Sequence, residues 1–249
     1  MFALITTEDP ITSPKDKKLQ QLVSDKLGRE FIGTVESDLT LQVMFDLEQL
    51  IGRNIIWTAT ESFEDLIYRQ KRNCLPNKFM RFCTTEMKLR AIFEYWFKYI
   101  NEVVEMRIGY RYDELERAES FTTSFKYANR CNNYGKRLQR WENVLWREGY
   151  FPLIEDKIIH LQIRDYWQKQ KLVFPKNSNC LGCFWKGFQE LRQNWETDPN
   201  KMEWFAKQED KTGRQFKKEA SMRSIKNLGL EPEFNFGFGS GCASGFCTD

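Results

Sequence analysis

A chain of 249 residues with 41% hydrophobic side chains can bury a substantial core, so the composition excludes an intrinsically disordered protein. Its 38 basic and 35 acidic side chains leave a net charge of +3, and from this balance we expect no nucleic-acid partner. The single histidine, His160, excludes multi-histidine metal sites and disfavours hydrolases that pair histidine with serine or cysteine. Metal ligands are therefore expected to be sulfur or carboxylate.

The compartment follows from the termini and the cysteines. No run of about 18 apolar residues is present, so no membrane span is predicted. Residues 1–7 lack the charged region and the long apolar core of a signal peptide. Seven cysteines, an odd number, without a secretion signal indicate a reducing compartment, and we expect a cytoplasmic protein.

Apolar runs alternate with helical patterns in the first 60 residues. Short strands are predicted at residues 2–6, 31–35 and 54–58, with helices at 15–27 and 39–50 that end at Gly28 and Gly52. This alternation indicates parallel βαβ units. We therefore predict an α/β fold with a mainly parallel central sheet and helices on both faces. A ligand is expected beyond the carboxyl ends of the strands, near residues 6–14, 34–38 and 58–62.

The remaining chain is less regular. The predicted elements are a helix from Thr84 or Thr85 to about residue 104, a strand ending at Ile108, a polar and aromatic insertion of partly helical character at 118–147, an extended segment at 151–154, and helices at 163–172, 186–208 and 215–227. We divide the chain into an α/β domain at residues 1–175 and a mostly helical, cysteine-containing region at residues 176–249.

Two cysteine pairs distinguish this C-terminal region. Cys180 and Cys183 stand in a Cys-x-x-Cys turn, and Cys242 and Cys247 lie in a glycine-rich tail. A Cys-x-x-Cys turn can direct both sulfurs at zinc or an iron–sulfur cluster, and it can also hold a redox-active dithiol. We predict that the two pairs share one site. The alternative is four unrelated buried cysteines, because free cysteine often packs as a small apolar residue.

Four separated segments carry a resemblance to a known family. They are Arg81-Phe-Cys-Thr with Lys88, Gly109-Tyr-Arg-Tyr-Asp-Glu with Arg117, Phe151-Pro-Leu-Ile-Glu-Asp with Ile163 and Trp167, and Cys180-x-x-Cys183 with the Cys-x-Ser-Gly-aromatic-Cys segment ending at Cys247. In this order they resemble the phosphoadenosine phosphosulfate (PAPS) reductase-like group of the adenine-nucleotide α-hydrolase (PP-loop) superfamily. The chain is especially similar to the forms found in phages and prophages and to DNA-phosphorothioation sulfurtransferases.

The resemblance implies binding of an adenine nucleotide or nucleotide sulfate, with thiol chemistry on sulfur by a reductase or a sulfurtransferase. It implies nucleotide or anion contacts from Arg111, Arg117, Asp113, Glu114, Lys88 and Arg81. It also implies an attacking thiolate at Cys242 or Cys247, and a [4Fe–4S] cluster or zinc ion held by Cys180, Cys183, Cys242, Cys247 and Cys83.

The chemistry of these residues leaves alternatives open. Arginine forks suit phosphate or sulfate, and Arg111 and Arg117 follow the end of a predicted strand. Both arginines could instead pair with Asp113 and Glu114 and cap a helix. Cys83 precedes a helix whose dipole is expected to lower the pKa of its thiol, but it could equally be a buried structural thiol.

One segment departs from the family pattern. The family carries a Ser-Gly-Gly-x-Asp-Ser loop after the first strand, where backbone N–H groups hold pyrophosphate. At this place residues 6–12 offer no glycine, Pro10 has no N–H, and Glu8 and Asp9 repel phosphate. We therefore expect a degenerate loop and weak or absent ATP hydrolysis. The alternative function is a catalytically inactive binding or assembly module, with a protein partner or a second copy of the chain.

Overall fold

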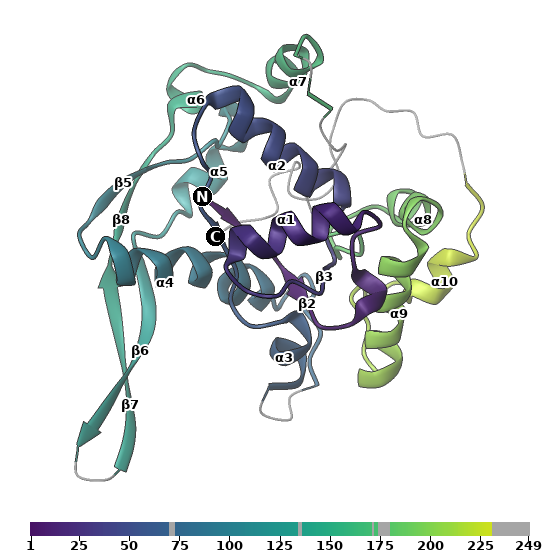
Figure 1. Cartoon of the computed structure of the whole chain (residues 1–249), viewed down its shortest axis with the longest axis horizontal. Helices are drawn as coiled ribbons and strands as arrows, with labels where there is room; N and C mark the ends of the chain where they lie inside the picture. The colour runs from purple at the N-terminus through teal and green to yellow at the C-terminus, as the bar shows by residue number, and fades with distance from the viewer. Residues whose placement is uncertain (70–72, 134–135, 171, 174–179, 231–249) are drawn as a thin grey trace. The chain divides into compact units, whose positions relative to one another are not determined.

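The computed structural model describes the chain except for residues 70–72, 134–135, 171, 174–179 and 231–249 (Figure 1). The protein is a mixed α/β structure, about half helical, with several two-stranded sheets. Two compact units are present: one combines residues 1–92 with the described residues from 164 onward, and the other is residues 93–163. The chain on both sides of residue 175 belongs to the first unit.

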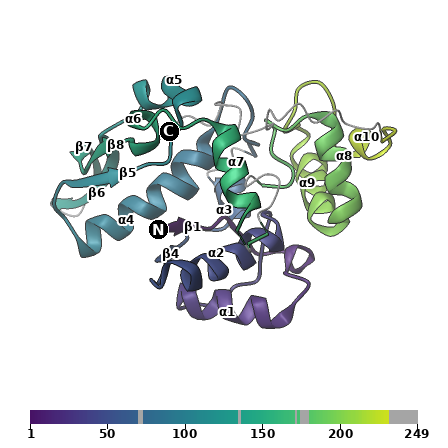
Figure 2. The ribbon, with the colours of Figure 1, turned by 90° about the horizontal axis from the view of Figure 1, so that it is seen from above.

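Helices α1 (Lys17–Leu27) and α2 (Asp38–Ile51) lie side by side in the first unit (Figures 1 and 2). An ion pair of 2.7 Å between Lys26 Nζ and Glu48 Oε2 joins them. Both helices end where a glycine takes a left-handed conformation, with φ of 64° at Gly28 and 63° at Gly52. The helix ends predicted from these glycines are therefore confirmed.

The strands of the first unit are short. β1 (Phe2–Ala3) pairs in parallel with β4 (Trp57–Thr58), whereas β2 (Thr6–Thr7) pairs antiparallel with β3 (Gly33–Thr34). Parallel pairing is thus confirmed for β1 and β4. The predicted central sheet is not seen, because the described strands form four separate two-stranded sheets. Side chains replace part of the missing ladder: the Thr34 hydroxyl, for example, donates to the Ile5 carbonyl at 2.7 Å.

Helices α3 (Phe63–Tyr68), α8 (Phe188–Thr197), α9 (Pro199–Thr212) and α10 (Met222–Lys226) complete the first unit. α8, α9 and α10 pack on one another (Figure 1). The single helix predicted at residues 186–208 is divided, because Asp198 caps a new helix that has Pro199 at its first position. Met202 and Phe205 of α9 are fully buried in the main core of this unit.

A π-helical turn, η3 (Thr84–Leu89), leads into α4 (Arg90–Tyr99), so the helix predicted to start at Thr84 or Thr85 is confirmed. It ends about five residues earlier than predicted. The reversal after α4 has Asn101 in a left-handed conformation with φ of 55°. The Trp96 indole N–H donates to the Glu102 carbonyl at 2.7 Å and stabilises this reversal.

The second unit contains two pairs of strands. β5 (Val104–Arg107) pairs in parallel with β8 (Arg147–Tyr150), and β6 (Ser124–Asn133) forms a long antiparallel ribbon with β7 (Lys136–Leu145). Short helical segments complete the connections: η4 (Tyr112–Glu114), α5 (Leu115–Glu119) and α6 (Pro152–Glu155). The boundary between the two units falls within α7 (His160–Gln168). The helical character predicted for residues 118–147 is wrong beyond α5, because alternating aromatic residues favour the ribbon. The extended segment predicted at 151–154 is helical, starting at Pro152.

No helix within the described ranges is long and apolar enough to cross a membrane.

Candidate functional site

The Cys180–Cys183 turn is a closely packed corner of the first unit. The Cys183 N–H donates to the Cys180 carbonyl at 3.1 Å and closes the turn. Gly182 lies so near the ring of Phe205 that an added Cβ would come within 2.4 Å of a ring carbon. Leu181 is buried in the core. A side chain at position 182 would therefore push the turn away from α9.

Two hydrogen bonds fix this turn to neighbouring elements. The Leu181 N–H donates to the Val35 carbonyl at 2.9 Å. From α8, the Asn194 side-chain amide donates to the Leu181 carbonyl at 2.7 Å. Val35 is fully buried and directly follows β3. The Cys-x-x-Cys turn is therefore held against the segment at residues 34–38, one of the places where a ligand is expected.

Cys83 and Lys88, at the π-helical turn, also lie near the Cys-x-x-Cys turn. Cys83 directly precedes the π-helical turn, and both Cys83 and Cys180 pack against the main core of the first unit. Lys88 Nζ lies 3.8 Å from Glu36 Oε1. Its charge also interacts with the thiols of Cys180, Cys83 and Cys183. Three thiols from two distant parts of the sequence therefore lie close enough to the Lys88 ammonium to interact with its charge. π-Helical turns frequently occur at functional sites.

Burial raises the pKa of all three thiols. The pKa of Cys83 rises to about 12 through burial and the neighbouring Cys183. Burial, reinforced by Glu36, raises the pKa of Cys180 well above its usual value, and burial raises that of Cys183. The lowered pKa predicted for Cys83 is therefore wrong, because lost solvation outweighs the favourable charge of Lys88. Such thiols are free and protonated, which makes them poor nucleophiles, but a metal ion can replace the proton.

Lys88 supplies a charge that suits a thiolate-bound metal. Burial favours its neutral form, but Glu36 and the three thiols raise its pKa, so the ammonium persists. Glu36 itself is 1% exposed, and burial raises its pKa against the opposing effects of Lys88 and Lys201. Among the described residues, no group donates to its Oε2 atom. Four thiolates around zinc or an iron–sulfur cluster carry net negative charge, which the Lys88 ammonium offsets.

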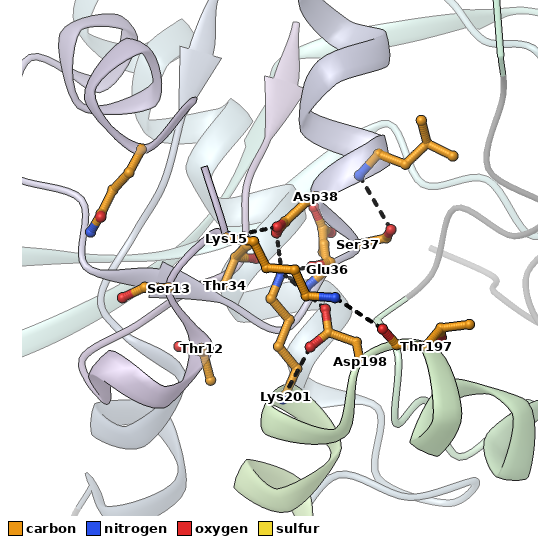
Figure 3. A network of polar contacts seen from close by, with 12 residues as sticks. Thr12, Ser13, Lys15, Thr34, Glu36, Ser37, Asp38, Thr197, Asp198 and Lys201 are labelled. Atoms are coloured by element: carbon orange, nitrogen blue, oxygen red, sulfur yellow. Dashed lines mark hydrogen bonds and ion pairs between the residues drawn. The ribbon is translucent and has the colours of Figure 1, made fainter. Parts of the chain in front are cut away.

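The main chain of Glu36 is held by a buried lysine of α9, as Figure 3 shows. Lys201 Nζ donates to the Glu36 carbonyl at 2.7 Å and to Asp38 Oδ1 at 2.5 Å. Asp198 Oδ2 lies 3.8 Å from the same ammonium. Asp38 also accepts the Lys15 N–H at 2.9 Å. The carboxylates from the starts of α2 and α9 therefore converge on Lys201. This lysine fixes residues 36–38, which directly follow the contact between Val35 and the Cys-x-x-Cys turn.

Polar groups of the loop at residues 6–12 form hydrogen bonds with other groups of the protein. Asp9 Oδ1 accepts an N–H from η1 (Pro10–Thr12) at 3.0 Å, and the Thr12 hydroxyl donates to the Asp9 carbonyl at 2.7 Å. The Glu8 N–H donates to Glu64 Oε2 at 3.1 Å. Asp9 therefore acts as the cap of a helical turn, and these groups are not directed together as a pyrophosphate loop requires.

Four of the six residues predicted to contact the anion lie together in the second unit. Arg111 Nε donates to Asp113 Oδ1 at 2.9 Å, and Arg111 Nη1 lies 3.1 Å from Glu114 Oε2. Arg117 Nη1 lies 2.7 Å from Glu114 Oε1 and stacks over Tyr110 at 4.3 Å. Burial alone would raise the pKa of Asp113, but the Arg111 hydrogen bond lowers it. Anion binding by these arginines stays a prediction, and an anion would compete with these carboxylates.

The remaining predicted residues divide between the first unit and the tail. Arg81 lies over the Trp185 ring at 5.9 Å, near the Cys-x-x-Cys turn. Cys242 and Cys247 lie outside the described residues. Within the described ranges, no three Cys, His, Asp or Glu side chains form a group ready to hold a metal ion. A metal centre therefore stays a prediction.

Sequence reasoning missed Glu36 and Lys201. Both are charged residues with almost no exposure, and both contact groups far away in the sequence. A weak signal exists at Lys201, which directly precedes a buried run that includes Met202, Trp204 and Phe205. A lysine on an apolar helix face usually requires a partner. The identity of that partner cannot be read from one helix.

No family model, curated protein or solved structure matches the chain.

Proposed function

We propose that the first unit holds a thiolate-ligated metal centre, either a [4Fe–4S] cluster or a zinc ion, on Cys83, Cys180 and Cys183. The observation that supports this proposal is that the three thiols lie close enough to the Lys88 ammonium for its charge to interact with each of them. The donor set fits both groups, since each accepts four thiolates. The raised thiol pKa values favour ligation over redox exchange, because exchange requires an accessible thiolate.

The fourth ligand in this proposal is Cys242 or Cys247. The other tail cysteine then remains available as the attacking thiolate. Following the resemblance, we propose a PAPS reductase-like enzyme that acts on the sulfur of an adenine nucleotide sulfate, as a reductase or a sulfurtransferase. When bound, the metal centre stabilises the thiolate form of its ligands and couples their order to folding.

The β1–α1–β3–α2–β4 segment supports the α/β part of this proposal. β1 and β4 are parallel and α1 and α2 lie in the connection between them, as in βαβ folds. The family's parallel central sheet with helices on both faces is proposed on this basis.

A second candidate function is a binding or assembly module without catalysis, and the loop at residues 6–12 favours it. Glu8 and Asp9 stand where the family binds pyrophosphate. At about 4 Å, one repulsion between charges near a protein surface costs on the order of 4 kcal/mol at an effective dielectric of 20. That weakens binding by about a thousandfold if nothing offsets it. The partner would then be another protein or a second copy of the chain.

Metal analysis and an absorption spectrum of protein purified without oxygen test the centre. We expect iron with sulfide, or zinc, at one centre per chain. Cys180→Ser and Cys83→Ser should each lose most of the metal. Cys74→Ser is the matched control, since Cys74 is a half-buried free thiol outside the cluster, and it should keep the metal. Metal-free protein that folds normally, or equal metal content in all three variants, would contradict the proposal.

Calorimetric titration with ATP, PAPS and adenosine phosphosulfate separates the two functions. The enzyme predicts binding of a nucleotide sulfate and weak binding of ATP, with Arg111→Gln and Arg117→Gln reducing any remaining affinity. The module predicts a metal-loaded protein that binds none of the three. Tight ATP binding with turnover would contradict both, because it requires a working pyrophosphate loop.

A further inference from the structure

The ribbon of β6 and β7 concentrates the positive charge of the protein. Its basic residues are Lys126, Arg130, Lys136, Arg137 and Arg140, and its one acidic residue is Glu142. Residues 124–145 therefore carry a net charge of +4, whereas the whole chain carries +3. The rest of the chain has a net charge of −1. The balanced total, from which no nucleic-acid partner was expected, hides this local concentration.

One face of the ribbon is anchored on α4 within the second unit. The rings of Phe125 and Phe93 stack with centroids 4.7 Å apart, and Tyr127 lies 5.3 Å from the same Phe93 ring. Phe93 is fully buried and also meets Trp146 edge-on at 5.5 Å. The base of the ribbon is therefore held by aromatic packing, which gives it a fixed direction.

The opposite face is exposed near the base of the ribbon, and by strand register it contains no acidic position. Trp141 is 58% exposed, and Lys126 Nζ lies 5.8 Å from the centre of its ring. Strand register continues this face with Arg130 opposite Gln139 and Asn132 opposite Arg137. The ribbon runs out beyond α4 (Figure 1). An aromatic and basic face without acidic residues has the charge complementary to a polyanion.

We propose that this ribbon binds duplex DNA by lying in the major groove. The major groove of B-DNA is about 12 Å wide and admits a two-stranded ribbon, whose strands lie about 4.8 Å apart. Ten residues at about 3.3 Å each span about 33 Å, the length of about ten base pairs. Lysine and arginine bind phosphates, and arginine, asparagine and glutamine are the residue types that read base edges. The deep, narrow major groove of duplex RNA does not admit the ribbon.

Fluorescence anisotropy with a labelled duplex of about twenty base pairs, twice the length of the ribbon, tests this inference. Binding should weaken with salt, and phosphate contacts by the three basic residues of this face, Lys126, Arg130 and Arg137, give a slope of log affinity against log salt of about −2.7. Arg130→Gln with Arg137→Gln should reduce that slope to about −0.9 and weaken binding about thirtyfold near 0.15 M salt. The matched control, Lys211→Gln with Arg214→Gln, removes the same charge from exposed positions at the end of α9 and should leave binding unchanged.

Single-stranded DNA, duplex RNA and vesicles of anionic lipid serve as competitors. The proposal expects duplex DNA to be preferred over all three, and circular dichroism should show the same folded state in every variant. No duplex binding at about 50 mM salt overturns the proposal. Equal losses in the ribbon and control variants overturn it as well, because the effect would then come from net charge alone. Preference for single strands, RNA or vesicles overturns the groove geometry.

Discussion

Replacing Lys201 by methionine tests how strongly the contact between α9 and residues 36–38 stabilises the fold. Methionine keeps most of the aliphatic volume but removes the ammonium that contacts Asp38 and the Glu36 carbonyl. Breaking a buried ion pair costs about 3–5 kcal/mol. The Asp38 side chain is 19% exposed and keeps some solvation, so we expect a loss near 3 kcal/mol. At about 2–4 °C per kcal/mol for a chain of this size, Tm should fall by about 6–12 °C.

Thermal and urea unfolding of Lys201→Met, Asp38→Asn and the double variant measure this pair. Asparagine at position 38 removes the charge but keeps an acceptor for the Lys15 N–H. The double variant should lose about 1–3 kcal/mol less than the sum of the single changes. Arg223→Met is the control, because its ion pairs lie at the exposed surface and contribute about 0–1 kcal/mol. Additive losses, or a Lys201→Met protein as stable as the wild type, would refute the reasoning.

Three further outcomes are expected. Gly182→Ala should overlap the Phe205 ring, cost about 1–3 kcal/mol and lower the metal content, whereas normal stability and metal content would show that the turn can move freely. Burial alone would raise the pKa of Glu48, but its bond with Lys26 lowers it below 4.5. Its carboxylate therefore stabilises the fold above pH 4.5, and this contribution is lost as the pH falls through the lower folded-state pKa. The Tm difference between the wild type and Glu48→Gln should accordingly shrink on acidification, and a difference independent of pH would contradict this. Asp9→Ala should lose about 1 kcal/mol of capping, measured by urea unfolding, with ATP affinity unchanged; loss of ATP affinity would instead show that Asp9 contacts a ligand or its metal.

Local patterns predicted the helices better than the sheets. Gly28 and Gly52 end helices through their own backbone freedom, so a short stretch of sequence contains the information. Strand pairing depends on distant partners, and here each early strand pairs over only two residues. Between them, hydroxyl groups such as that of Thr34 accept and donate the bonds that a longer ladder would supply. The strands within residues 118–147 were still harder to predict, because the many polar residues there obscure the alternation of Phe125 and Tyr127.

The candidate site shows the same division between local and distant information. Cys180 and Cys183 are predictable because the spacing alone brings their backbones into one turn. Their proximity to Cys83 follows from the resemblance or from the structure, and no local pattern contains it. The two lysines are the least predictable part: Lys88 Nζ lies 3.8 Å from the Glu36 carboxyl group, whereas Lys201 donates to the Glu36 carbonyl.

These two lysines oppose the effect of burial on Glu36, whose pKa is nevertheless raised. Without Lys88, ionised Glu36 would raise the pKa of Cys180 further and oppose the release of protons that metal binding requires. In the proposed four-thiolate centre, the Lys88 ammonium would offset part of the negative charge, and Lys201 would hold the main chain of Glu36 in place. The segment that follows β3 would then support the thiols by its position, whether the centre is a zinc ion or an iron–sulfur cluster.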